Sequence, residues 1–145
     1  FVTEDEIMAV VPAAHRLAQN SELKWADLSD EPLVILARGS TYEMIISALE
    51  QQGVGVSHTE TLSYTESLYA MAHSGLRIGL LSHLYTQGRC TDGLVTLPVK
   101  SPVVSRRISL MVRSAADQSR RSIVQECWDF LADKMGTTPS SKAKR

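Results

Sequence analysis

The sequence has few of the features that mark specialised classes of protein. Its 145 residues hold two cysteines, and the formal net charge is -1 at pH 7. We interpret Cys90 and Cys127 as free thiols of a reducing compartment, with one structural disulfide as the alternative. The near-neutral charge gives no reason to expect that this chain by itself binds nucleic acid.

Membrane and catalytic motifs are missing as well. No apolar run is long enough to span a bilayer, and the first residues do not resemble a signal peptide. There is no G-x-S-x-G, no G-x-x-x-x-G-K-[ST] and no G-x-G-x-x-G. We therefore predict no membrane partner, no enzymatic activity and no cofactor. The four histidines share no metal-ligand spacing, so we predict no metal site: His15, His58, His73 and His83.

Hydrophobic residues make up 43% of the chain. At this length, that is enough for a hydrophobic core that does not depend on disulfides or metal ions. Short apolar runs alternate with stretches of helical period, which indicates an α/β fold with a mostly parallel sheet. The expected strands are residues 6–12, 32–36, 56–61, 77–81, 94–99 and 107–113. Because of Pro98, we expect the strand at 94–99 to lie toward an edge of the sheet.

The expected helices span residues 41–52 and 64–74, with a last one from about 114 to 135. The first places Tyr42, Ile45, Ile46 and Leu49 on one face. Trp25 and Leu28 are expected anchors of the core. The last helix carries an apolar stripe around Trp128, which we interpret as core or as a dimer surface.

Two segments share one pattern: a strand, a small turn and a helix with a possible reciprocal cap. Ser40 precedes Glu43, and Ser63 precedes Glu66, each by the spacing of a capping box. If the two strands run parallel, both helix N-termini lie at one edge of the sheet and face a shared cleft. That edge is where α/β sheets bind ligands, and free N–H groups there favour anions. The pattern therefore predicts a receptor for a small molecule.

Several motifs in order resemble the effector-binding domain of LysR-type transcriptional regulators. They begin with Ala9-Val-Val-Pro-Ala-Ala-His-Arg-Leu-Ala18, then Trp25-Ala-Asp-Leu28 ahead of a short strand. Ala72-His-Ser-Gly-Leu-Arg-Ile-Gly-Leu-Leu81 and Leu94-Val-Thr-Leu-Pro-Val99 follow. The resemblance runs from about Asp5 to Asp133. The sequence departs from the family pattern at three positions: Arg16, Arg77 and Ser82. Arg77 is expected to lie near the pocket or a subunit contact.

The resemblance implies the fold of type II periplasmic binding proteins, two Rossmann-like lobes joined by crossing hinge strands. Residues 20–105 would form the second, effector-binding lobe. Residues 1–19 and 106–135 would belong to an incomplete first lobe, and residues 136–145 to a disordered tail.

The implied function is that of a cytoplasmic, bacterial effector-binding domain that senses a small, anionic metabolite and controls transcription. The implied partners are the effector and further copies of the chain, as a homodimer or tetramer. DNA would be bound only through an N-terminal helix-turn-helix that is not in this sequence. The alternative is an extracytoplasmic solute-binding protein of the same fold.

The predicted effector-binding residues lie in the two turns that follow the strands at 32–36 and 56–61. They are Arg38, Gly39, Ser40, Thr41, Leu62, Ser63 and Tyr64. The guanidinium of Arg38 suits a carboxylate, although a solvated surface arginine is the commoner role for such a residue. Ser40 and Ser63 could equally serve only as helix caps.

Overall fold

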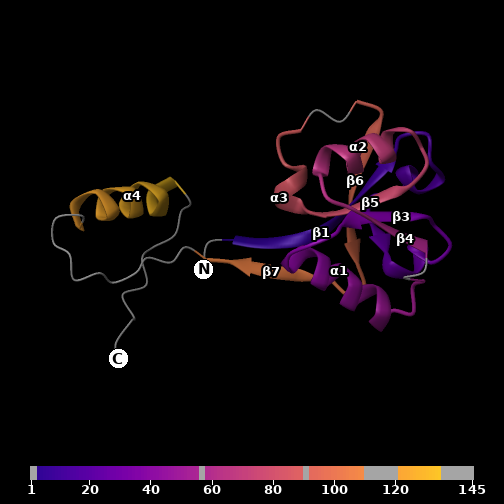
Figure 1. Ribbon diagram of the computed structural model, residues 1–145, viewed down its shortest axis with the longest axis horizontal. Coiled ribbons are helices and arrows are strands. Elements are labelled where there is room, and N and C mark those ends of the chain that lie inside the picture. Colours follow the sequence, from indigo (N-terminus) through magenta and orange to yellow (C-terminus); the bar gives the residue numbers. More distant parts are fainter. Residues whose placement is uncertain (1–2, 56–57, 90–91, 110–120, 135–145) are drawn as a thin grey trace. The chain divides into compact units, whose positions relative to one another are not determined.

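The computed structural model describes residues 3–55, 58–89, 92–109 and 121–134 (Figure 1). The chain divides into a compact unit, Asp5–Arg106, and a second unit made of Phe1–Glu4 and Arg107–Arg145. The strands are β1 (Thr3–Pro12), β2 (Leu23–Lys24), β3 (Leu33–Leu36), β4 (Thr59–Leu62), β5 (Ile78–Ser82), β6 (Leu94–Lys100) and β7 (Ser105–Ile108). The helices are η1 (Arg16–Gln19), η2 (Trp25–Leu28), α1 (Ser40–Gln51), α2 (Thr65–His73), α3 (His83–Thr86) and α4 (Arg121–Lys134).

The strands form one mixed sheet in the order β2-β6-β1-β5-β3-β4, with β7 beside β1. β3 runs parallel to β4 and to β5, as the alternating pattern predicts. β1 runs antiparallel to both of its long neighbours, β5 and β6. The α/β class is therefore confirmed, while the expectation of a mostly parallel sheet holds for β3, β4 and β5 and for the short pairing of β2 with β6, and not for the two long neighbours of β1.

β6 is not the edge strand that Pro98 suggests. It lies between β1 and β2, and Pro98 is in register with Met8 of β1. β2 is two residues long and pairs only with Val99 and Lys100. The short partner lets a proline sit in β6 because, in the described pairing, β2 begins just past it.

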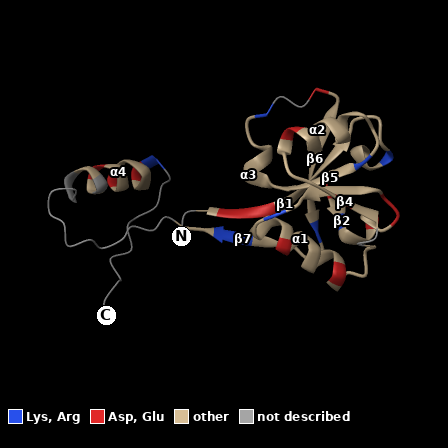
Figure 2. Cartoon of the chain, in the orientation of Figure 1, with Lys and Arg blue, Asp and Glu red and all other residues tan. Residues whose placement is uncertain are grey.

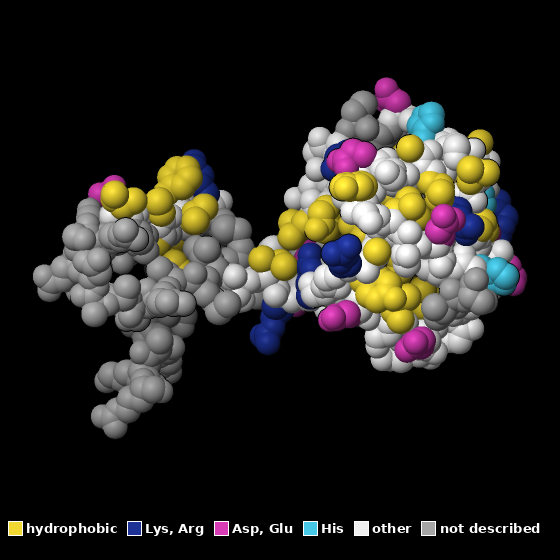
Figure 3. Space-filling model, viewed as in Figure 1, with side chains coloured by type: hydrophobic (Ala, Val, Ile, Leu, Met, Phe, Trp, Pro, Cys, Tyr) yellow, Lys and Arg dark blue, Asp and Glu magenta, His cyan; other side chains and the backbone are white. Residues whose placement is uncertain are grey.

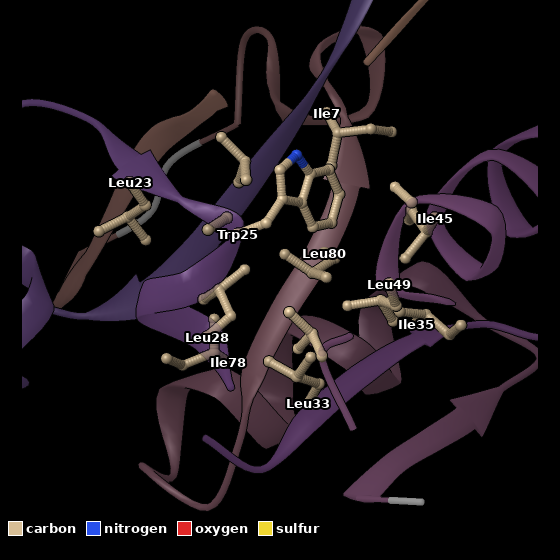
Figure 4. Packing of buried hydrophobic residues seen from close by; sticks show 14 of the residues in the cluster. Ile7, Leu23, Trp25, Leu28, Leu33, Ile35, Ile45, Leu49, Ile78 and Leu80 are labelled. Carbon is tan, nitrogen blue, oxygen red and sulfur yellow. The ribbon is translucent and has the colours of Figure 1, made fainter. Parts of the chain in front are cut away.

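The two main helices cover opposite faces of the sheet. Side chains alternate along a strand, so Leu33 and Ile35 point to one face and Val34 to the other. Ile45 of α1 packs into the same cluster as Leu33 and Ile35 (Figure 4), whereas Leu68 of α2 packs with Val34. Both faces are covered, and this explains why β3 reads as a continuous hydrophobic run.

Trp25 and Leu28 anchor the larger cluster, as predicted. Both side chains are fully buried (Figure 4). The indole Nε1–H of Trp25 donates a hydrogen bond to the carbonyl of Pro102 at 3.0 Å. This bond satisfies the one polar atom of a buried indole and ties η2 to the segment between β6 and β7.

The predicted last helix is found as α4, in the second unit, but its apolar stripe is not core in the described chain. Ile123 is 69% exposed, Leu131 and Cys127 are exposed, and Trp128 is half-buried. The start of the predicted helix, residues 114–120, lies outside the described residues. The same holds for most of the predicted strand 107–113 and for the predicted tail at 136–145.

Within the described residues, no helix combines the length and the apolar character that crossing a membrane requires.

Gly79 of β5 gives the packing a direct test. A Cβ built on Gly79 would lie 2.5 Å from Cδ2 of the fully buried Leu68. We expect Gly79→Ala to lower the free energy of unfolding by about 1–3 kcal/mol, the usual effect of overpacking, in urea denaturation. In a Leu68→Ala background the obstruction is gone, so the same substitution should cost less there. An equal cost in both backgrounds would contradict this packing.

Candidate functional site

The carboxyl ends of β3, β4 and β5 meet at one edge of the sheet because these strands are parallel (Figure 1). A short turn leads from β3 into α1, another from β4 into α2, and α3 follows β5 directly. Both predicted helix starts thus lie at the predicted edge. The helices themselves cover opposite faces of the sheet, so their first turns do not converge on one point in the way that the sequence pattern suggests.

The two reciprocal caps predicted from the sequence are wrong. The N-cap of α1 is Gly39, at φ 88°, a backbone conformation that favours glycine, and Ser40 is the first helical residue. The N-cap of α2 is Tyr64. Neither helix has a side-chain hydrogen bond at its cap. Each serine lies one position away from the N-cap, so its hydroxyl is available for other partners.

A cavity of about 460 Å³ lies at this edge. It is lined by residues of the two turns, the start of α2, and α3: Leu36, Ala37, Arg38, Ser63, Tyr64, Thr65 and Tyr85. Three of the predicted effector-binding residues are therefore brought together here: Arg38, Ser63 and Tyr64. Its volume falls in the range of small-molecule sites in proteins.

The lining combines one cation, hydroxyl groups and exposed aromatic surface. Arg38 is exposed and lines the cavity. Tyr64 is 71% exposed and Tyr85 42% exposed, so both rings offer apolar surface to a ligand. A guanidinium matches a carboxylate in shape and charge, and the rings suit a flat or apolar body.

The other four predicted residues do not line this cavity. Thr41 is buried in α1, and Leu62 packs against the smaller hydrophobic cluster. Gly39 and Ser40 are exposed at the start of α1. Ser40 has a partner that the sequence reasoning missed: its hydroxyl oxygen accepts a hydrogen bond from Nη1 of Arg106.

Arg106 belongs to a network around a buried carboxylate, Asp5 of β1, whose side chain is 0% exposed. Oδ2 of Asp5 accepts hydrogen bonds from Nε and Nη2 of Arg106 at 2.9 and 2.7 Å. Oδ1 accepts one from the backbone N–H of Leu84 at 3.0 Å. Nη2 of Arg106 also lies 3.4 Å from the hydroxyl of Ser82. The acidic start of β1 and the basic β7 lie together in Figure 2.

The sequence held a sign of this network. Asp5, Ile7 and Ala9 alternate along β1 and are all buried, so Asp5 occupies a core position of its strand. A carboxylate there needs a counter-charge. The sequence does not say which cation supplies it, because Arg106 is 101 positions away. The local sequence therefore does not mark Arg106 as the partner of Asp5.

A second cavity, of about 430 Å³, lies along α2. Arg89 pairs with Glu66 at 3.2 Å and lies 4.9 Å from the ring centre of Tyr69, and all three line the cavity. The pKa of Glu66 is lowered because its carboxylate accepts hydrogen bonds from its own backbone N–H and from Arg89. Burial raises the pKa of Tyr69 by disfavouring the phenolate.

Arg77 lies at the opposite edge from the first cavity. It precedes β5 and pairs with Glu60 at 2.8 Å, and its Nη1 donates to the carbonyl of His58 at 3.1 Å. These contacts hold the amino ends of the parallel strands together. A place for Arg77 near the pocket is therefore wrong, and the alternative of a subunit contact stays a prediction.

Among the described residues, no group of three or more His, Cys, Asp and Glu side chains is arranged to hold a metal ion. Cys127 is an exposed free thiol. Cys90 lies outside the described residues, so the predicted state of the two thiols as a pair stays a prediction.

A mixed α/β sheet with a solute-sized cavity at its carboxyl edge defines a ligand-binding fold. The family model described as "LysR substrate binding domain" matches residues 1–136. The chain therefore belongs to the family of LysR substrate-binding domains, which have the type II periplasmic-binding-protein fold.

Solved structures of regulators share this fold. Full-length BenM aligns with a TM-score of 0.71 at 16% identity, covering 97% of this chain and 48% of that one. HinK, a LysR family transcriptional regulator from Pseudomonas aeruginosa, has a TM-score of 0.67 at 21% identity, over 88% of this chain and 45% of that one. The BenM effector-binding domain with its effector benzoate has a TM-score of 0.69 at 15% identity, covering 99% of this chain and 67% of that one. This chain spans about half the length of full-length BenM. No curated protein sequence matches it.

The Asp5–Arg106 pair predicts an asymmetric effect on stability. Arg106→Met leaves a fully buried carboxylate without its counter-charge and should cost about 3–5 kcal/mol. Asp5→Asn leaves the arginine, whose side chain is 23% exposed and can be hydrated, and should cost about 1–3 kcal/mol. Urea denaturation at neutral pH measures both variants, and equal or reversed costs would contradict the pairing.

Glu66 predicts a dependence on pH. Its pKa is lower in the folded chain than the ordinary 4.5, so ionised Glu66 stabilises the fold above pH 4.5. That contribution is lost as the pH falls through the folded pKa. The stability advantage of the wild-type chain over Glu66→Gln should therefore be present at pH 7 and shrink toward pH 3 in urea denaturation. In an Arg89→Gln background it should be smaller at pH 7, and a difference that ignores pH would contradict the assignment.

Proposed function

We propose that this chain is the effector-binding part of a LysR-type transcriptional regulator and that its effector is a small anionic metabolite. The observation that carries the proposal is the cavity at the carboxyl edge, in which Arg38 lies beside Ser63 and Tyr64. Membership of the LysR substrate-binding family supports the regulatory role.

The chemistry of the lining favours an anion with an apolar or aromatic body. Arg38 supplies a planar cation, and Ser63 and Thr65 supply hydroxyl donors beside it. The first residue of α2, Thr65, also lines the cavity, so the positive end of that helix dipole faces the same space. The solved BenM domain holds benzoate, an aromatic carboxylate, which makes benzoate a sensible first probe.

The lobe boundaries and the remaining site residues belong to this proposal. Residues 20–105 would correspond to the second lobe, and residues 1–19 and 106–135 to part of the first. The turn residues Gly39, Ser40, Thr41 and Leu62 would support the effector site from the margin of the cavity. Binding of the effector would favour one arrangement of the domain over another and shift its population.

In the full-length protein, this shift would change how copies of the chain associate in a homodimer or tetramer. DNA contact would come through an N-terminal helix-turn-helix outside this sequence, in the bacterial cytoplasm. On the face drawn in Figure 3, Lys and Arg side chains of the larger unit lie singly, several next to Asp or Glu. Such a distribution offers no stripe of positive charge for a nucleic acid on that face.

The proposal assigns no catalysis to the site. HinK, which shares the fold, is a LysR family transcriptional regulator, and the match to the LysR family favours this role over that of an extracytoplasmic solute-binding protein. The ligand would therefore be bound and released unchanged.

A thermal-shift panel of small carboxylates, benzoate included, tests the anion site. A ligand at 100 times its dissociation constant stabilises the folded chain by about 2.7 kcal/mol, which raises the melting temperature measurably. Arg38→Gln should weaken binding of the best carboxylate by about tenfold to a hundredfold, the usual range for a hydrogen bond to a charged group. Arg89→Gln, at the second cavity, is the matched control and should leave the affinity unchanged.

Three outcomes would refute the proposal. The first is a panel in which no carboxylate stabilises the chain. The second is an Arg38→Gln variant that binds the best carboxylate as tightly as the wild-type chain. The third is an Arg89→Gln variant that loses as much affinity as Arg38→Gln.

A further inference from the structure

Arg106 joins the start of α1, at the carboxyl edge of the sheet, to the two strands at the boundary of the compact unit. That unit begins at Asp5 and ends at Arg106, so the ion pair lies where the chain enters and leaves it. The same guanidinium contacts Ser40, the first residue of α1. One side chain therefore bonds to β1 and to the start of the helix that follows β3.

The direction of the bond to Ser40 follows from chemistry. A guanidinium carries five N–H donors and no acceptor, so the oxygen of Ser40 must accept. The hydroxyl proton of Ser40 then points away from Arg106 and is free to be donated. Ser40 is exposed, and it makes no cap bond to its own helix. Its proton is thus presented at the carboxyl edge of the sheet.

Arg106 also keeps a donor for a ligand. Four hydrogen bonds account for Nε, for both N–H groups of Nη2 and for one N–H group of Nη1. The second N–H of Nη1 has no partner among the residues that the structure describes. It lies next to the hydroxyl of Ser40, so the two groups form a pair of neighbouring donors.

We propose that Arg106 is a positioning residue for effector recognition, which fixes the hydroxyl of Ser40 as a donor to an oxygen acceptor of the effector, such as a carboxylate. This inference rests on the proposed function and extends it to a residue outside the cavity lining. The buried Asp5 holds the guanidinium in place, so the orientation of Ser40 is set before the ligand arrives. A ligand oxygen at Ser40 would in turn be connected through Arg106 to β1 and β7.

A double-mutant cycle on carboxylate affinity tests the inference, with the 145-residue chain and the best carboxylate of the panel. Arg106→Lys keeps a cation beside Asp5 but loses the fork that reaches Ser40. We expect Arg106→Lys and Ser40→Ala each to weaken binding by about threefold to tenfold, the range for one hydrogen bond. The double variant should lose no more than Ser40→Ala alone, because Arg106 acts through Ser40.

Arg77→Lys is the matched control. It makes the same change in an ion-paired arginine at the opposite edge of the sheet and should leave the affinity unchanged. Wild-type affinity in Arg106→Lys or Ser40→Ala, or single losses that multiply in the double variant, would overturn the inference. With Arg38 still required for binding, either result leaves the proposed function standing. If no carboxylate binds, the inference and the proposed function are both refuted.

A measurement on the wild-type chain guards against a variant that fails to fold. Carboxylate titration followed by NMR of the arginine side chains should move the Nε–H resonance of Arg106 with the midpoint of binding. The Nε–H resonance of Arg77 should stay fixed. A resonance of Arg106 that does not respond, in a chain that binds the carboxylate, would also overturn the inference.

Discussion

A buried carboxylate sets the constraints on one end of this sheet. Asp5 occupies a core position of β1, and its charge is compensated by the guanidinium of Arg106 from β7. An uncompensated charge at that position would cost several kcal/mol, so the two strands must come together for the unit to fold. The pair joins β1 to β7, its neighbour in the sheet. The remaining acceptor of Asp5 is satisfied by the backbone of Leu84, which fixes the start of α3.

The parallel strands β3, β4 and β5 explain why the carboxyl edge is suited to ligand binding. They bring two chain turns and the start of α3 to this edge, while α1 and α2 cover the two faces of the sheet. Their polar groups are then divided between two tasks. Arg38 and Ser63 line a cavity, whereas Ser40 is bonded to the structural network around Asp5. In the proposed function, a ligand that contacts Ser40 would thereby be connected to the network around the buried Asp5.

Much of this arrangement could be predicted from local patterns. The apolar run 32–36 and the helical period of 41–52 correspond to β3 and α1. Both could be predicted because a buried strand or helix face produces a hydrophobic pattern within a short stretch of sequence. The family resemblance extended this to the fold. Strand direction escaped prediction for β1, since an apolar run is the same pattern in either direction. The predicted cap of α1 was misplaced by one residue because the conformation of Gly39 made it the N-cap and left Ser40 inside the helix. The predicted cap of α2 was misplaced in the other direction, since its N-cap is Tyr64.

Two arginines illustrate how position along the strands decides the role of a charge. Arg77 and Arg106 each form an ion pair and each bond to atoms from other elements. Arg77 binds carbonyls and Glu60 at the amino ends of the parallel strands, where strands are simply held in register. Arg106 lies at the carboxyl end, bonded to the hydroxyl of the exposed Ser40. The sequence singles out Arg77 and not Arg106. Their places in the sheet favour Arg106 as the arginine that serves the proposed function, because Arg106 is bonded to Ser40, an exposed residue at the carboxyl edge.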